Sequence, residues 1–239
     1  MKFELCMWPL QNSLRGQLLE SVCQRIDCLV GALRESSEKP PKVHLTVPGA
    51  VDRRRAPRMP LGLHVDTNAI GTYVTAIVYL TTLSQPGGDG ATVFPCASHA
   101  AKDAGSASPI GPHQVMCKQK AAESLLAEEV LHTDHTHGSS VMTSRNAQVL
   151  LNAADNYEGL SVFPEAGKLM LFFTRGDDGR VDPLSWHGGA AVGMQGATEK
   201  WILQLCKEVP LGSRAGTAQA AFVAARRKHA LATAARPNT

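Results

Sequence analysis

His64, Asp66 and His187 are the residues of this chain whose types and spacing could hold a reactive metal ion. His64 and Asp66 are two positions apart, and alternate side chains of a β-strand share a face, so both could reach one ion. Two imidazoles and one carboxylate are the ligand set of a non-haem iron(II) centre that keeps open positions for a co-substrate and O2. A His-x-Asp pair alone is weak evidence, because such pairs are common on strand edges.

The segments around these residues have the character of strands joined by turns. Residues 72–80 are a run of β-branched and aromatic residues, which favours a buried strand over a helix. A turn-forming segment, 86–90, follows, and a second one at 164–167 leads into the apolar residues 169–173. A further turn at Asp178 precedes His187. The sequence therefore predicts strands that bring the two histidines into one sheet structure.

Five motifs in these segments resemble the prolyl 4-hydroxylase-like family of iron(II)- and 2-oxoglutarate-dependent dioxygenases. They are an H-x-D pair, a T-x-x-x-Y-L strand, a glycine-rich turn ending in T-x-F, a P-x-x-G-x-x-x-x-F segment, and a D-G turn followed by H-x-G. In this chain they lie, in the same order, at 64–66, 75–80, 87–94, 164–172 and 178–189. The resemblance covers about residues 60 to 95 and 160 to 210, which is less than half of the chain.

The resemblance implies a mainly β fold, a double-stranded β-helix or jelly-roll of two sheets. It implies that His64, Asp66 and His187 are ligands of Fe(II). It also implies that Lys200 pairs with the distal carboxylate of the co-substrate 2-oxoglutarate, with the Tyr79 hydroxyl as a second donor. Strand alternation agrees, because Lys200 would share a face with Gln204 and Tyr79 a face with Thr75. The alternative for Lys200 is an exposed charge at a strand end.

The activity implied by the resemblance is hydroxylation of a prolyl side chain in a peptide or protein. O2 and 2-oxoglutarate would be consumed, succinate and CO2 released, and ascorbate would keep the iron reduced. No catalytic residue beyond the metal ligands is needed. Two alternatives stay open: a hydroxylase of another amino acid or small molecule, and a non-catalytic jelly-roll binding module. The second is suggested by segment 53–63, which lacks the aromatic residue that relatives carry before H-x-D.

Length and patterning predict one catalytic domain, residues 1–210, followed by a basic, alanine-rich tail, residues 211–239. Helical spacing of leucines, with Ser13 as a cap, predicts an N-terminal helix at 13–35. The proline-rich segment 36–60 is expected to be a loop with a short edge strand at 43–47. The tail is expected to be a helix or a frayed, solvated extension.

Two segments lie between or beside the motifs and have no match in the family. Residues 96–158 are expected to be an insertion that could act as a substrate lid. Its cluster His132, His135 and His137 could bind a second metal, although a polar loop is the commoner explanation. Residues 193–198 are expected to lengthen the hairpin before Lys200, which stands farther after His187 than the basic residue of relatives usually does.

Charge and cysteine content bear on partners and compartment. The net charge is +3, and the residues after Pro210 hold five basic and no acidic side chains, which leaves 3 − 5 = −2 for the rest. The catalytic part is therefore nearly neutral, and no nucleic-acid partner is expected.

Six cysteines without a C-x-x-C pair are expected to be buried free thiols in a reducing, intracellular compartment, most simply the cytoplasm. No secretory signal or membrane span is expected, and the oligomeric state is left open.

Overall fold

We describe a computed structural model of the 239-residue chain. The structure describes residues 2–6, 14–32, 38–48, 61–66, 71–83, 90–94, 97, 140–141, 160–190, 192 and 199–235. Ser13, the arginine-rich segment 53–60, the histidine cluster at 132–137, nearly all of the expected insertion and the loop 193–198 lie outside these residues.

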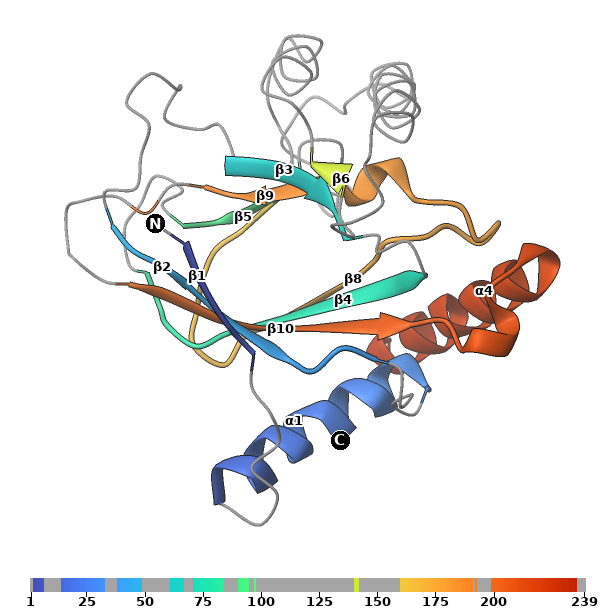
Figure 1. Cartoon of the computed structure of the whole chain (residues 1–239), viewed down its shortest axis with the longest axis horizontal. Helices are drawn as coiled ribbons and strands as arrows, with labels where there is room; N and C mark the ends of the chain where they lie inside the picture. Colours follow the sequence, from blue (N-terminus) through green and yellow to red (C-terminus); the bar gives the residue numbers. More distant parts are fainter. Residues whose placement is uncertain are drawn as a thin grey trace, which may run out of the picture.

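The described residues include ten strands, which form two five-stranded sheets that face each other (Figure 1). The larger sheet has the order β1 (Lys2–Cys6), β2 (Lys42–Thr46), β10 (Lys200–Glu208), β4 (Thr72–Tyr79), β8 (Leu169–Phe173). The smaller sheet has the order β6 (Ser140–Val141), β3 (Leu61–Val65), β9 (His187–Gly189), β5 (Thr92–Phe94), β7 (Leu160–Val162). Every pairing is antiparallel.

The order in which the chain visits the two sheets defines the fold. From β2 to β5 the chain alternates between the larger and the smaller sheet, and it alternates again from β7 to β10. The two four-strand passes interleave within each sheet, since β10 lies between β2 and β4, and β9 lies between β3 and β5. This is a double-stranded β-helix, which confirms the predicted jelly-roll.

Strand β4 shows why the larger sheet forms the centre of the molecule. All but one of its residues are buried, because both of its faces are covered. On one face Val74 and Ala76 pack in a cluster with Ile26 and Val30 of helix α1 (Leu14–Val30). On the other face Ile77 and Tyr79 pack in a cluster between the sheets, together with Phe94 and Met170. A strand covered on both sides requires the near-continuous apolar run that the sequence shows.

Strand β2 differs from its prediction as an edge strand. It pairs with β10 on one side and with β1 on the other, so it lies inside the sheet. The reason is β1, which the sequence did not predict, and which pairs along the whole of β2 from Lys2 opposite Thr46 to Cys6 opposite Lys42.

Helix α1 ends earlier than predicted. It ends at Val30, and Gly31 follows with a φ of 68°. The amide of Gly31 donates to the carbonyl of Cys28, and that of Ala32 donates to the carbonyl of Asp27. A glycine in the left-handed region is a common way to end a helix, because other residues are strained there.

The C-terminal segment is an ordered part of the fold. Two short 3₁₀ turns occur, η1 (Pro183–Ser185) and η2 (Leu211–Ser213), and helix α4 (Gly216–Ala234) follows the second. Val223 of α4 is fully buried in the cluster that also holds α1 and Tyr73, and the Phe222 and Tyr73 rings meet edge to face at 5.3 Å. The expectation of a helix is therefore confirmed for this segment and that of a frayed, solvated extension is wrong, because α4 docks through its few apolar side chains.

The described cysteines differ in exposure. Cys23 is a buried free thiol and Cys206 is partly buried, whereas Cys28 is exposed on α1. The prediction of buried thiols is thus wrong for Cys28, which lies on the outward side of the helix. None of the helices that the structure describes combines the length and apolar character needed to cross a membrane.

Candidate metal centre

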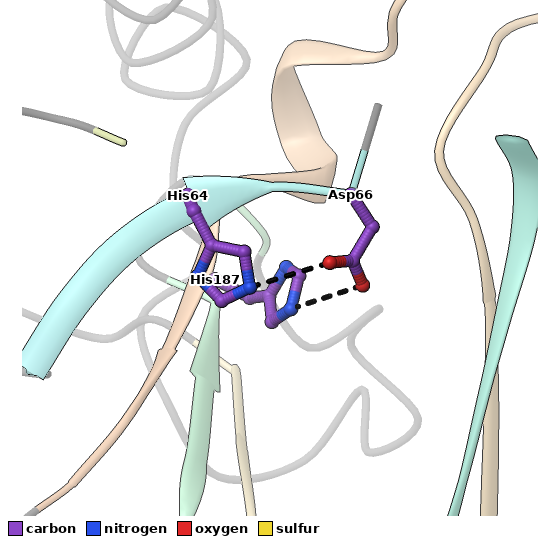
Figure 2. Close-up of side chains that lie close together, drawn as sticks. All are labelled: His64, Asp66 and His187. Carbon is purple, nitrogen blue, oxygen red and sulfur yellow. Dashed lines mark ion pairs between the residues drawn. The ribbon is translucent and has the colours of Figure 1, made fainter. Parts of the chain in front are cut away.

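His64, Asp66 and His187 lie together, with their side chains turned toward one another (Figure 2). One possible ligand atom from each residue lies within 4.8 Å of the other two. Asp66 Oδ1 is 3.3 Å from His64 Nε2, and Asp66 Oδ2 is 3.5 Å from His187 Nε2. Among the described residues this is the one group of His, Cys, Asp and Glu side chains arranged to hold a metal ion.

The register of the smaller sheet brings these residues together. His64 of β3 lies directly opposite His187 of β9, and their ring centroids are 4.3 Å apart. Side chains at opposite positions of an antiparallel pair are close neighbours on one face. Asp66 follows the end of β3 two residues after His64, so it extends toward the same side. Two strands that are far apart in sequence therefore supply all three groups.

A backbone carbonyl orients His187. Its Nδ1 lies 2.9 Å from the carbonyl oxygen of Ser185, and because a carbonyl can only accept, Nδ1 carries the hydrogen. In the neutral ring Nε2 then carries the lone pair, and this nitrogen lies 3.5 Å from Asp66 Oδ2. Such a hydrogen bond from the second ring nitrogen is the usual support of a metal-binding histidine. The Phe94 and Phe172 rings pack against the imidazole at 5.5 and 4.8 Å, which keeps that side apolar.

Two side chains of the larger sheet orient Asp66. Its Oδ2 accepts a hydrogen bond of 2.8 Å from the Thr75 hydroxyl and one of 3.1 Å from the Gln204 amide. Burial by itself would raise the pKa of the Asp66 carboxyl, but the opposing effects of His187, His64 and Thr75 are together larger. They hold this pKa well below its ordinary value, so Asp66 stays ionised, as a metal ligand must be.

The donor set fits a divalent transition metal such as iron(II). It offers two imidazole nitrogens and one carboxylate oxygen, and Asp66 and His187 are buried and held in place by neighbours outside the group. Sites of this composition bind non-haem iron and leave other coordination positions open. The prediction that these three residues converge is confirmed, while their role as ligands stays a prediction.

Lys200 and Tyr79 lie side by side between the sheets. Lys200 is 5% exposed, and its Nζ lies 5.7 Å from the centre of the Tyr79 ring. The alternative of an exposed strand-end charge is therefore wrong. The Tyr79 hydroxyl donates to Thr92 Oγ1 at 2.7 Å, and burial raises the pKa of Tyr79 to about 12, so its hydroxyl keeps its proton.

Lys200 belongs to the same face of β10 as Gln204, which touches Asp66. Four residues of strand separate them by about 13 Å, at about 3.3 Å per residue. Gly90, two residues before β5, has a φ of 74°, and a Cβ built there would lie 3.5 Å from Cδ of Lys200 and only 2.4 Å from a Leu83 methyl group. The segment that leads into the smaller sheet thus comes close to the aliphatic part of the Lys200 side chain. The Lys200 ammonium group is buried between the sheets, at some distance along β10 from the candidate metal centre.

Several supporting residues received no role from the sequence. Thr75 and Gln204 were placed on the correct strand faces by alternation, and that signal could have identified them as polar groups facing Asp66. Thr92 could have been found in the same way from the T-x-F motif. Ser185 acts through its backbone carbonyl, which any residue could supply, so its side chain carried no signal.

No protein-family model matches the sequence, and no curated protein matches it significantly. Solved structures do match in fold. One is a prolyl 4-hydroxylase of Pseudomonas putida, with 14% identity and a TM-score of 0.40, covering 87% of this chain and 69% of that one. Another is a viral collagen prolyl hydroxylase of Paramecium Bursaria Chlorella virus-1, with 13% identity and a TM-score of 0.42, covering 86% and 77%.

A third match is HygX of Streptomyces hygroscopicus, solved with nickel and 2-oxoglutarate bound, with 11% identity and a TM-score of 0.42, covering 87% of this chain and 70% of that one. These overlaps are partial, so the strand order of the chain itself is what defines the fold. The chain is thus similar to solved structures that include prolyl 4-hydroxylases, and its own strand order makes it a double-stranded β-helix that carries the H-x-D…H group.

Proposed function

We propose that this chain is an iron(II)- and 2-oxoglutarate-dependent dioxygenase in which His64, Asp66 and His187 hold the metal. The observation that carries the proposal is the convergence of these side chains between the sheets of a double-stranded β-helix, with Asp66 and His187 each oriented by hydrogen bonds from outside the group. A cluster that formed by chance on a strand surface would not need a buried, ionised carboxylate with two hydrogen-bond donors of its own.

The residues of the chain have distinct tasks in this reaction. When bound, iron(II) would supply O2 activation coupled to oxidation of 2-oxoglutarate to succinate and CO2, and the substrate would gain a hydroxyl group. His187 and His64 would present Nε2 lone pairs, and Asp66 would supply the negative charge. Phe94 and Phe172 would exclude water beside His187. No side chain need act as a general acid or base.

We assign the co-substrate carboxylate to Lys200. A buried ammonium on the inner face is suited to bind a carboxylate, and charge-assisted hydrogen bonds are strong. The Tyr79 hydroxyl is the proposed second donor, but its proton is directed to Thr92. Tyr79 would therefore have to exchange this hydrogen bond when the co-substrate binds.

For the substrate we propose a prolyl side chain in a peptide or protein, with ascorbate as the reductant of the iron. Support comes from the five sequence motifs that resemble prolyl 4-hydroxylases. Those motifs build the metal and co-substrate sites. The competing hypothesis keeps both sites and replaces the substrate with another amino acid or a small molecule. Succinate release, measured over a panel of prolyl peptides, free amino acids and small molecules, separates the two.

The metal and co-substrate sites are tested by titrating the protein anaerobically with iron(II) and 2-oxoglutarate. We expect the visible metal-to-ligand charge-transfer band of the chelate in the wild-type protein. His187→Ala should lack the band, because one of the three ligands is gone. His229→Gln, which removes an exposed histidine of α4 outside the site, should keep it.

The result that contradicts the proposal is a wild-type protein that is folded by circular dichroism and shows no band. A band that persists in His187→Ala would also count against it, since the metal would then be bound elsewhere.

A further inference from the structure

Helix α4 contacts the segment that precedes His187, and Arg227 of this helix makes several polar contacts with it. Its Nε lies 3.0 Å from Asp177 Oδ1, and its Nη1 donates to the carbonyl of Arg175 at 2.8 Å and lies 3.5 Å from Asp182 Oδ2. Its guanidinium also lies over the Phe173 ring, 5.4 Å from the centroid. One side chain of the C-terminal helix therefore contacts both ends of the turn 175–182.

The turn is folded tightly between α4 and the larger sheet. Arg175 donates from Nε to the carbonyl of Thr72 and from Nη1 to that of Gly179, both at 3.0 Å. A Cβ built on Gly179, which has a φ of 76°, would lie 3.1 Å from the backbone nitrogen of Ala220 in α4. The tip of the turn therefore packs directly against the backbone of α4, so a shift of α4 would displace the turn.

Asp182 connects Arg227 to the residues that precede His187. While Oδ2 faces Arg227, Oδ1 accepts a hydrogen bond of 2.9 Å from the amide of Leu184. The carbonyl of Asp182 accepts from the amide and the hydroxyl of Ser185, at 2.9 and 2.6 Å. These bonds shape η1 and set the direction of the Ser185 carbonyl, which holds His187 Nδ1 at 2.9 Å.

Helix α4 also contacts the C-terminal end of α1, through side chains other than Arg227. Arg226 donates to the carbonyl of Gly31, and a ring nitrogen of His229 lies 3.1 Å from the carbonyl of Cys28. Adjacent arginines of α4 therefore serve two separate contacts, one with the end of α1 and one with the turn before His187. This separation makes the two roles experimentally distinguishable.

We propose that Arg227 is a positioning residue for the metal centre, which holds the Ser185 carbonyl, and through it the His187 imidazole, in the orientation that presents Nε2 to Asp66. The proposal rests on the assignment of His187 as a metal ligand. It gives the C-terminal helix a part in metal binding through the turn 175–182.

The first test is amide hydrogen exchange of the metal-free protein. Arg227→Gln should increase exchange at the amides of Leu184 and Ser185, because both donate to Asp182, which loses its contact with Arg227. Arg226→Gln removes a neighbouring charge and the contact with α1, and should leave these two amides unchanged. Lys228→Gln removes an exposed charge and is the second control.

The second test is titration with cobalt(II), followed by its visible absorption. Loss of an outer hydrogen-bond partner lowers metal affinity by about 10- to 100-fold, and we expect the lower end for Arg227→Gln because Arg227 acts through Asp182 and Ser185. Arg226→Gln should bind cobalt like the wild-type protein. In an Asp182→Asn background, Arg227→Gln should have little further effect, since the two changes interrupt the same chain of contacts.

The proposal is overturned if Arg227→Gln leaves both the exchange of these amides and the cobalt affinity at wild-type values. It is also overturned if Arg226→Gln weakens cobalt binding as much as Arg227→Gln, because α4 would then act only through general stability. A wild-type protein that binds no cobalt would refute the metal site itself, and the exchange comparison would still show whether Arg227 orders the turn.

Discussion

Hydrogen bonds orient two of the three side chains of the candidate metal centre, Asp66 and His187. Thr75 and Gln204 fix one oxygen of Asp66, and the Ser185 carbonyl fixes the His187 ring. Groups that are already oriented lose less conformational freedom when a ligand binds, so more of the interaction energy contributes to affinity. Asp66 and His187 are therefore already oriented to bind a metal ion.

Lys200 provides a prediction at this scale. Lys200→Met keeps the apolar stem and removes the charge, so 2-oxoglutarate should bind about 10- to 150-fold more weakly, since a hydrogen bond to a charged group contributes about 1.5–3 kcal/mol. Iron(II) affinity without co-substrate should change little. Both affinities can be measured by anaerobic calorimetry.

The matched control is Lys168→Met, which removes a more exposed lysine that pairs with Glu165 at the turn before β8. It should leave co-substrate binding unchanged. Equal 2-oxoglutarate affinities for the wild-type protein and Lys200→Met would show that the carboxylate is held elsewhere.

At the scale of elements, a buried ionic group joins three parts of the chain. Lys207 of β10 lies 2.8 Å from Asp27 of α1 and 2.9 Å from Glu38, which precedes β2. Burial raises the pKa of the Glu38 carboxyl above its ordinary value of 4.5, and the attraction of Lys207 only partly offsets this. Two carboxylates share one ammonium, so the group carries an excess negative charge in a buried place.

This arrangement predicts a dependence of stability on pH. Because its folded-state pKa is raised, Glu38 favours the folded state most below pH 4.5, and this contribution is lost as pH rises through the raised pKa. Glu38→Gln cannot titrate. The free energy of unfolding of the wild-type protein, relative to that of Glu38→Gln, should therefore fall from pH 4.5 toward neutrality in urea unfolding experiments.

Glu20→Gln serves as the control, since Glu20 is an exposed residue of α1. The pH dependence measured for this exposed side chain is the reference with which that of Glu38→Gln is compared. A wild-type advantage over Glu38→Gln that grows with pH would contradict the raised pKa and indicate that Lys207 dominates.

At the scale of the whole molecule, the candidate metal centre ties the two sheets together. His64 and His187 belong to the smaller sheet, and Asp66 follows one of its strands, while Thr75 and Gln204 reach Asp66 from the larger sheet. An ion held by the three ligands would be bound by the folded state and not by the separated sheets. Metal binding and folding should therefore be coupled.

The corresponding prediction concerns thermal and chemical unfolding with cobalt(II). At a free metal concentration 100-fold above its dissociation constant, the free energy of unfolding should rise by about 2.7 kcal/mol. Asp66→Asn should show little of this increase, because the ligand charge is lost. Equal stabilisation of both proteins would mean that the metal binds outside the proposed site.

Much of the fold and of the candidate centre could be predicted from local patterns. The strand character of residues 72–80, the turns before β8 and His187, and the pairing of His64 with Asp66 on one face all depend on residues that are near in sequence. Strand alternation placed Lys200 and Gln204 on one inner face for the same reason. The family resemblance connected these local segments into a jelly-roll and nominated Lys200 and Tyr79.

The errors concern contacts between distant segments. Strand β1 and the interior place of β2 depend on a pairing that neither strand specifies alone. The docking of α4 depends on Val223 packing into the cluster formed by α1 and β4, which the weakly apolar tail did not suggest.

The sequence by itself determined the ligand types, the alternation of strand faces and the turns, because spacing along a chain dictates which side chains share a face. Only the tertiary structure decided that His187 lies opposite His64, that Lys200 is buried, and that the turn before His187 rests on α4. These outcomes require segments far apart in the chain to pack together, and packing is a property of the folded molecule as a whole.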